Sequence, residues 1–289
     1  MALAFIPSDA AMLAVQAAVV AAPRRPPQAA WLSRVSGPVW AIIPIASIIG
    51  VVYAIRYASA TATGLTYLAL IAVPLLAAAA LGWASRGARP WAAVLAIPLF
   101  VAAWALRTSL VGEGAATLLS ALSCVTLGVI LATVTPPGWL KAGIVAMSAA
   151  DVWLVLSDLL QAPNAALVAA APGHHLPQLQ SELFGSVSMG YGDLFVAALL
   201  GAALGRQCRR QGPIALLTLV LAGLFDLLFF VLNELPATVP VAVALLVGEL
   251  WEWWARRRRA AREPSLRGAG ASASASAGAA SEPATAGPV

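Results

Sequence analysis

The chain alternates between long apolar runs and short polar or proline-rich segments. An α-helix needs about 20 predominantly apolar residues to cross the hydrocarbon core of a bilayer. Eight runs come close to this length and are predicted to be membrane-spanning helices. They are residues 38–58, 62–84, 90–107, 114–134, 139–160, 183–205, 213–232 and 236–254. The pattern therefore predicts an all-α fold, a polytopic membrane helix bundle.

Residues 1–37 precede the first of these runs and allow three interpretations. The apolar stretch 10–22 is shorter than a full span, and Asp9 and Gln16 make the segment less apolar. The segment is a signal-like sequence, a helix at the membrane interface or a marginal extra span. The bundle is therefore predicted to have eight spans, or nine if residues 1–22 cross the membrane.

The far end of the chain has a different composition. From about residue 260 it is rich in Ala, Ser, Gly and Pro, which is typical of disordered segments. Four parts are predicted. They are an N-terminal segment over 1–37, a four-helix membrane bundle over 38–134, a second group of membrane helices over 139–254, and a disordered tail over 255–289.

The overall composition excludes most soluble classes of protein. Hydrophobic residues make up 61% of the chain and charged residues only 10%, against about 45–50% and 25% in soluble domains. The net charge of +5 does not indicate nucleic acid, because the run Arg256–Arg259 follows a predicted span and is explained as a membrane anchor. Cys124 and Cys208 form no disulfide or zinc pattern, and the adjacent His174 and His175 are expected to be solvated. No metal, cofactor or nucleic-acid partner is therefore expected.

The distribution of basic residues predicts the topology. With residues 1–37 in the cytoplasm, the eight spans place 15 of the 17 Lys and Arg residues on the inner side, and only Arg56 and Arg107 outside. The reverse orientation would place those 15 outside, against the positive-inside rule. We therefore expect a multi-pass protein of the cell membrane with a cytoplasmic C-terminus. The basic start of the tail is expected to contact anionic headgroups of the lipid bilayer.

Three acidic residues lie deep within predicted spans: Asp151, Asp193 and Asp226. A carboxylate at such a depth costs roughly 2.5–3.5 kcal/mol on insertion scales. Asp151 is twelve residues from Trp139 and Asp193 twelve residues from Gly205, at the inner ends of their spans. At 1.5 Å per residue, both lie roughly 18 Å from the inner surface. Because consecutive elements are usually neighbours, Asp151 and Asp193 are expected to face each other.

Two neighbouring carboxyl groups in a low dielectric suit one kind of chemistry. One keeps a proton while the other is ionised. The ionised group can take a proton from water that attacks a carbonyl, and the protonated group can polarise the carbonyl oxygen. Asp151 and Asp193 are therefore the candidate catalytic pair. Asp226 lies at a similar depth, so it either hydrogen-bonds within the bundle, tunes this pair or replaces Asp151 as the partner of Asp193.

Three segments resemble the motifs of one enzyme family. Gly-Tyr-Gly-Asp at 190–193 is similar to the GxGD motif of the presenilin and signal peptide peptidase family of intramembrane aspartyl proteases. In this family the preceding span contains the partner aspartate, which Asp151 and the following Val-Trp resemble. Pro-Ala-Thr at 236–238 resembles the Pro-Ala-Leu motif two spans later. The resemblance implies catalytic Asp151 and Asp193, and substrate-binding Gly190, Tyr191, Gly192, Pro236, Ala237 and Thr238.

The resemblance also implies a class of substrate, and the chain differs from the family pattern in several features. The family cleaves transmembrane helical peptides, including signal-peptide remnants, without a cofactor. The predicted orientation of the two aspartate helices resembles that of signal peptide peptidase, which implies substrates with a cytoplasmic N-terminus. This chain has Ala150 where the family usually has Tyr, has Thr238 where it has Leu, and has eight predicted spans where it has nine.

Other functions remain open from the sequence. Prepilin peptidases have a similar GxGD helix, but they usually have a lysine soon after the aspartate, where this chain has Leu194, Phe195 and Val196. A proton-coupled membrane transporter would use the same deep aspartates as an ion relay. An inactive protease-like fold would only bind membrane helices. The sequence indicates no oligomeric state.

Overall fold

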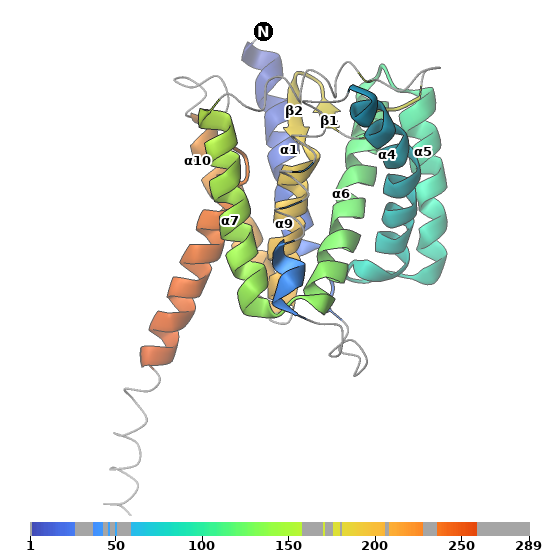
Figure 1. Ribbon diagram of the computed structural model, residues 1–289. Coiled ribbons are helices and arrows are strands. Elements are labelled where there is room, and N and C mark those ends of the chain that lie inside the picture. The colour runs from blue at the N-terminus through green and yellow to red at the C-terminus, as the bar shows by residue number, and fades with distance from the viewer. Residues whose placement is uncertain are drawn as a thin grey trace, which may run out of the picture. The chain divides into compact units, whose positions relative to one another are not determined.

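The computed structural model describes residues 2–26, 37–42, 46, 50, 59–157, 170, 176–179, 181–205, 208–227 and 236–258. The chain divides into two compact units, Met1–Leu245 and Leu246–Val289. The described residues are mostly helical, with one β-hairpin (Figure 1). The α-helices are α1 (Ala2–Ala21), α4 (Ser59–Ala79), α5 (Ala96–Ala105), α6 (Leu110–Val134), α7 (Pro137–Leu156), α9 (Tyr191–Leu204), α10 (Cys208–Asp226) and a last helix over 239–258.

Shorter elements complete this list. Pro38–Ala41 and Pro90–Leu95 are 3-10 helices, each with proline in its first turn, where its missing N–H costs no hydrogen bond. Ala80–Ala84 is a π-helical turn that follows α4 directly. The hairpin consists of β1 (Ser181–Phe184) and β2 (Val187–Gly190), which are antiparallel, with Phe184 opposite Val187.

Helix α9 forms the centre of the first unit. Nine of its fourteen residues are buried, and it packs against α1, α6, α7 and α10. Small residues let the neighbouring backbones approach closely. A Cβ atom at Gly128 of α6 would lie 2.8 Å from the carbonyl oxygen of Ala198, and one at Gly201 would collide with the carbonyl oxygen of Val20. The stretch that contains Asp193 is therefore the packing core of this unit (Figure 1).

Helix α1 belongs to the same core. Its side chains Met12, Gln16 and Val20 are at most 1% exposed, and the helix packs against α9 and α10. Such burial favours the third interpretation of the N-terminal segment, an extra helix that packs within the bundle, over a signal-like or interfacial segment. The polar residues that shorten its apolar run point into the protein.

Three helices of the described chain are long and apolar enough to cross a membrane: Thr63–Ala84, Leu110–Val134 and Pro137–Leu156. Pro7–Ala21, Pro90–Ala105 and Tyr191–Leu204 are shorter apolar helices. The predicted span 213–232 is helical where the structure describes it, the span 236–254 is helical from residue 239, and most of 38–58 lies outside the described residues. By length and composition, these helices indicate a helical membrane protein.

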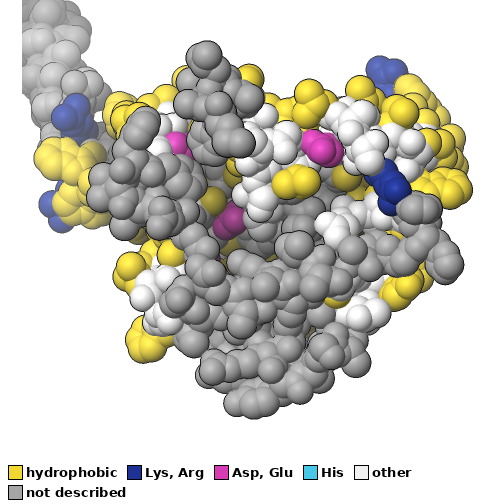
Figure 2. Space-filling model, turned by 90° about the horizontal axis from the view of Figure 1, so that it is seen from above, with side chains coloured by type: hydrophobic (Ala, Val, Ile, Leu, Met, Phe, Trp, Pro, Cys, Tyr) yellow, Lys and Arg dark blue, Asp and Glu magenta, His cyan; other side chains and the backbone are white. Residues whose placement is uncertain are grey.

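The outer faces of several helices are apolar. Leu68, Ile71 and Leu75 are exposed along one face of α4, and Leu216, Val220 and Leu224 along one face of α10. Figure 2 shows hydrophobic side chains at the rim of the face seen from above and acidic side chains inward of them. Buried polar side chains, in contrast, line the interior: Gln16, Thr66, Thr117, Ser120, Ser123, Thr126, Ser148, Gln211 and Thr218 among others. Apolar outer faces around an interior that contains polar side chains within its hydrophobic core suit a lipid environment.

The predicted span 183–205 is not one continuous helix. Its first part is the β-hairpin, and α9 begins only at Tyr191. Asp193 is therefore in the first turn of α9 rather than in the middle of a helix. The sequence contains a signal for this, since apolar Val187 and Met189 alternate with Ser186 and Ser188, which is the period of a strand.

Three connections meet at the lower end of the first unit in Figure 1. Pro23 and Ser85 form an isolated antiparallel bridge. The side-chain amide of Gln211 donates to the carbonyl oxygen of Pro23 at 2.9 Å and to that of Gly201 at 2.6 Å, and Arg86 donates to the Gln211 side chain. The segments after α1, α4 and α9, all predicted to be on the inner side, therefore share one end of the bundle.

Candidate active site

Asp193 occupies the start of α9. The N–H of Gly190, the N-cap residue, donates to Asp193 Oδ2 at 3.1 Å. A carboxylate in the first turn also interacts favourably with the N-terminal end of the helix dipole. A Cβ atom at Gly190 would lie 3.2 Å from Asp193 Oδ2, which is a tight contact. The absence of a side chain at the first glycine of the motif therefore makes space for the Asp193 carboxylate.

Asp151 is on α7, and its contacts come from the start of the last helix. The hydroxyl of Thr238 donates to Asp151 Oδ2 at 2.6 Å. Thr238 is the residue before helix 239–258, whose Ala242 N–H donates to the Thr238 carbonyl oxygen at 3.1 Å. Ser148, one turn before Asp151, donates to the same carbonyl oxygen at 3.0 Å.

The two carboxyl groups are neighbours. Asp193 lies close enough to Asp151 for their charges to repel each other, and α7 packs against α9 (Figure 1). Asp226 has a different neighbour, because its carboxyl group lies close to that of Asp9 on α1. The geometry therefore joins Asp193 with Asp151 and Asp226 with Asp9.

The remaining residues of the GxGD segment differ in their surroundings. The Tyr191 hydroxyl and Ser123 Oγ on α6 are 2.7 Å apart and share a hydrogen bond. Tyr191, which is predicted to bind substrate, is therefore held in place by a hydrogen bond to α6. A Cβ atom at Gly192 would meet no atom within 4 Å, so the space above this glycine is open.

The segment 236–238 is held from two sides. Thr238 binds to α7, and the carbonyl oxygen of Ala237 accepts a 3.0 Å hydrogen bond from the Gln16 side-chain amide of α1. Pro236 is half-buried beside them. All three segments that resemble family motifs therefore converge on one region of the first unit.

Sequence reasoning missed the part that α1 plays there. It treated Asp9 and Gln16 only as residues that weaken an apolar run. Their spacing of seven residues puts them on the same face of a helix, and such a polar pair in an otherwise apolar helix indicates a buried functional face.

The β-hairpin leads directly into the site. β2 ends at Gly190, next to Asp193. Its two-residue turn begins with Gly185, whose φ of +62° suits glycine, and the Gly185 N–H donates to Glu113 Oε2 of α6 at 2.7 Å. A two-stranded hairpin has edges on which backbone groups can pair with a further extended segment.

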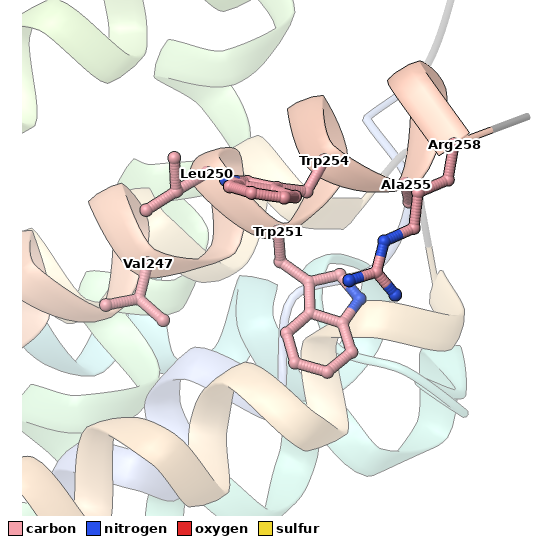
Figure 3. Close-up of a pocket in the computed structure, with 6 residues that line it drawn as sticks. All are labelled: Val247, Leu250, Trp251, Trp254, Ala255 and Arg258. Atoms are coloured by element: carbon pink, nitrogen blue, oxygen red, sulfur yellow. The ribbon is translucent and has the colours of Figure 1, made fainter. Parts of the chain in front are cut away.

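Two cavities lie elsewhere. One, of about 270 Å³, is lined by residues that include Arg107, Glu113, Gln178 and Leu183. The other, of about 330 Å³, is a groove in the second unit along one helix (Figure 3), lined by Val247, Leu250, Trp251, Trp254, Ala255 and Arg258. Neither is lined by Asp151 or Asp193.

Metal chemistry has no candidate centre in the described part of the chain. No group of three or more His, Cys, Asp or Glu residues there is placed to hold a metal ion. His174 and His175 lie outside the described residues.

Comparison with known proteins finds no match, whether with protein-family models, with curated proteins or with solved structures. The chemistry is therefore inferred from the site itself. Two adjacent carboxyl groups, one in the first turn of α9 and the other beside the start of helix 239–258, can share one proton and act on a water molecule and a carbonyl group together.

Proposed function

We propose that this protein is an intramembrane aspartyl endopeptidase of the presenilin and signal peptide peptidase type. The observation that supports this most directly is the proximity of Asp193 to Asp151 on neighbouring helices. The resemblance of three separate segments to that family's motifs gains weight from their convergence around these two carboxyl groups. The buried position of α1 supports a nine-span bundle with α1 as its first span.

The proposed reaction is the hydrolysis of a peptide bond. The ionised aspartate takes a proton from water while the water oxygen bonds to the carbonyl carbon, and the protonated aspartate gives its proton to the carbonyl oxygen. In the resulting tetrahedral diol, the first aspartate returns its proton to the amide nitrogen and the C–N bond breaks. A diol hydroxyl gives its proton to the second aspartate, which restores the pair and releases a carboxylic acid and an amine.

The substrate is proposed to be a single membrane-spanning peptide that unwinds at the site. A peptide bond within a helix is shielded by the helix's own turns, so an extended conformation exposes it. The strand edges of the β1–β2 hairpin offer backbone partners for such a segment. The open space above Gly192 leaves room for its backbone next to Asp193.

The position of the pair favours membrane helices over cytoplasmic leader peptides. The lower end of the bundle includes Arg24 and Arg86, whereas Asp193 is in the first turn at the opposite end of α9. A prepilin-peptidase-like site would be near the basic, cytoplasmic end. With the basic end inside, the proposal includes a preference for substrates whose N-terminus is cytoplasmic.

The experiment that tests the proposal is cleavage of labelled transmembrane peptides by the purified full-length chain in bilayer nanodiscs. Asp151→Asn and Asp193→Asn are each expected to lower the rate at least a hundredfold. Asp226→Asn is the matched control, because it removes a carboxyl group of the same bundle whose partner is Asp9, and it is expected to retain most activity. Full activity of either dyad variant, or no cleavage of peptides in either orientation by the wild type, would reject the proposal.

A proton-coupled transporter is the second candidate, and the proximity of the Asp9 and Asp226 carboxyl groups favours it. Carboxyl groups within membrane helices form the proton relays of carriers. This function predicts pH-dependent flux in vesicles that is lost in Asp226→Asn, and no peptide cleavage. The same purified variants therefore distinguish the two functions.

A further inference from the structure

The most specific contact in the site comes from the residue where this chain departs from the family motif. Thr238 has a hydroxyl where the family has the apolar side chain of leucine. This hydroxyl donates to Asp151 Oδ2 at 2.6 Å. That length falls in the range of O–H···O⁻ hydrogen bonds to an ionised carboxylate.

We propose that Thr238 is a positioning residue that keeps Asp151 as the ionised member of the pair, so that Asp151 is the general base and Asp193 the general acid. The roles of general base and general acid rest on the proposed proteolytic function. The assignment of the negative charge to Asp151 does not depend on that function.

The surroundings of the two carboxyl groups differ in the required sense. Asp151 accepts a 2.6 Å hydrogen bond from the Thr238 hydroxyl, at the N-terminal end of helix 239–258. Asp193 accepts a longer one, of 3.1 Å, from the backbone N–H of Gly190 in its own turn. The shorter hydrogen bond favours the charged form of its acceptor more strongly. Since only one of two adjacent carboxyl groups is ionised, the charge belongs on Asp151.

Two further contacts hold the Thr238 hydroxyl in place. Ser148 Oγ donates to the Thr238 carbonyl oxygen at 3.0 Å, one turn before Asp151 on the same helix. Gln16 donates to the preceding carbonyl oxygen, that of Ala237. Among the described residues, the titratable neighbour of Asp151 is Asp193. The segment 236–238 thus presents a fixed donor to one carboxyl group.

The assignment has a consequence for the direction of attack. Water is activated on the side of Asp151, between α7 and the start of the last helix, and the substrate carbonyl oxygen points to Asp193. The open space above Gly192 is on the side of the acid, where the carbonyl group must enter.

The test measures protonation directly and does not depend on turnover. The chain has five aspartates, so selective ¹³C labelling of the aspartate carboxyl carbon gives few NMR signals, which Asn variants assign. In wild-type protein in nanodiscs at neutral pH, we expect a carboxylate shift for Asp151 and a carboxylic acid shift for Asp193. In Thr238→Val, the Asp151 carboxylate loses its hydrogen bond to the hydroxyl, so its signal at neutral pH is expected to move toward the carboxylic acid shift.

Two variants serve as controls. Thr238→Ser keeps the hydroxyl and is expected to titrate like the wild type. Thr218→Val removes another buried hydroxyl, one that donates only to the Ile214 carbonyl oxygen at 2.9 Å within α10, and it is expected to leave both dyad signals unchanged. In cleavage assays, the acidic limb of the kcat/KM profile moves to higher pH in Thr238→Val and returns in Thr238→Ser.

The outcomes separate the two proposals. An ionised Asp193 beside a protonated Asp151, or a titration that Thr238→Val leaves unchanged, overturns the role of Thr238 whether or not the protein cleaves peptides. The expected titration in a protein that cleaves no peptide supports the role of Thr238 and rejects the proteolytic function. Thermal unfolding of each variant identifies any that fails to fold. If Thr238→Val fails to fold, the dyad signals of Thr238→Ser are compared with those of the wild type.

Discussion

The side-chain amide of Gln16 donates a 3.0 Å hydrogen bond to the backbone carbonyl oxygen of Ala237. The two residues are 221 positions apart, and the bond joins the first helix of the chain to the segment before the last one. Gln16 is 1% exposed, and its own Oε1 is buried without a hydrogen-bond partner in the described structure. Burying an amide with one unpaired oxygen costs stability. Gln16 is therefore not explained by stability, and we infer that its hydrogen bond to Ala237 positions segment 236–238.

Gln16→Leu is therefore expected to affect activity more than stability. The substitution leaves the Ala237 carbonyl oxygen unpaired, which costs about 1–3 kcal/mol, but it also removes the unpaired Oε1, which offsets much of that cost. We expect a change of less than about 1 kcal/mol in the free energy of unfolding and a fall in kcat of about tenfold or more. A variant that unfolds readily but cleaves normally per folded molecule would contradict a positioning role for Gln16.

The two glycines of the motif are expected to respond differently to alanine. At Gly192 an added Cβ meets no atom within 4 Å, and alanine within a helix is favoured over glycine by roughly 0.5–1 kcal/mol. Gly192→Ala should therefore raise the melting temperature slightly while it lowers the cleavage rate, because the methyl group occupies the space proposed for substrate. Gly190→Ala presses on Asp193 Oδ2 and should lower the rate without any gain in stability. Unchanged cleavage by Gly192→Ala would place the substrate elsewhere.

The hairpin turn gives a prediction about stability alone. Gly185 has a φ of +62° and Gly87 a φ of +70°, and a residue with a Cβ pays roughly 1–2 kcal/mol in this region. At Gly87 an added Cβ meets open space, whereas at Gly185 it collides with the Ser8 hydroxyl on α1. Denaturant unfolding should show a clearly larger loss of stability for Gly185→Ala than for Gly87→Ala. Equal losses would mean that the hairpin does not pack against α1.

The predicted topology can be tested at two exposed positions. Ser186 is exposed in the hairpin turn, and Arg89 is exposed just after the turn Arg86–Gly87. In a background with Cys124 and Cys208 replaced, Ser186→Cys should react with a membrane-impermeant maleimide added outside intact cells. Arg89→Cys should react only after the cells are opened. The opposite pattern would reverse the orientation and with it the proposed preference for substrates with a cytoplasmic N-terminus.

Composition and periodicity were sufficient to predict several features of this protein. Long apolar runs require a helical membrane fold whatever their packing, because each helix satisfies its own backbone. The placement of arginines around 24, 86 and 209 predicted which connections share an end, and the contacts of Gln211 with Pro23 and Gly201 join such connections in space. The aspartates at 151 and 193 also stood out by depth alone, because a carboxylate is costly there.

The tertiary structure determined which aspartates are neighbours, which their depth in the membrane does not determine. The sequence favoured Asp151 as the partner of Asp193 but left Asp226 as an alternative, since the distance along a helix gives no direction around it. Packing joined Asp193 with Asp151 and Asp226 with Asp9. It also turned the start of the run 183–205 into a hairpin, because an alternating pattern of only four residues, 186–189, is hidden within an apolar run of helical length. The contact of Thr238 with Asp151 spans 87 positions. No local pattern predicts such a contact, since it exists only where the start of the last helix meets α7.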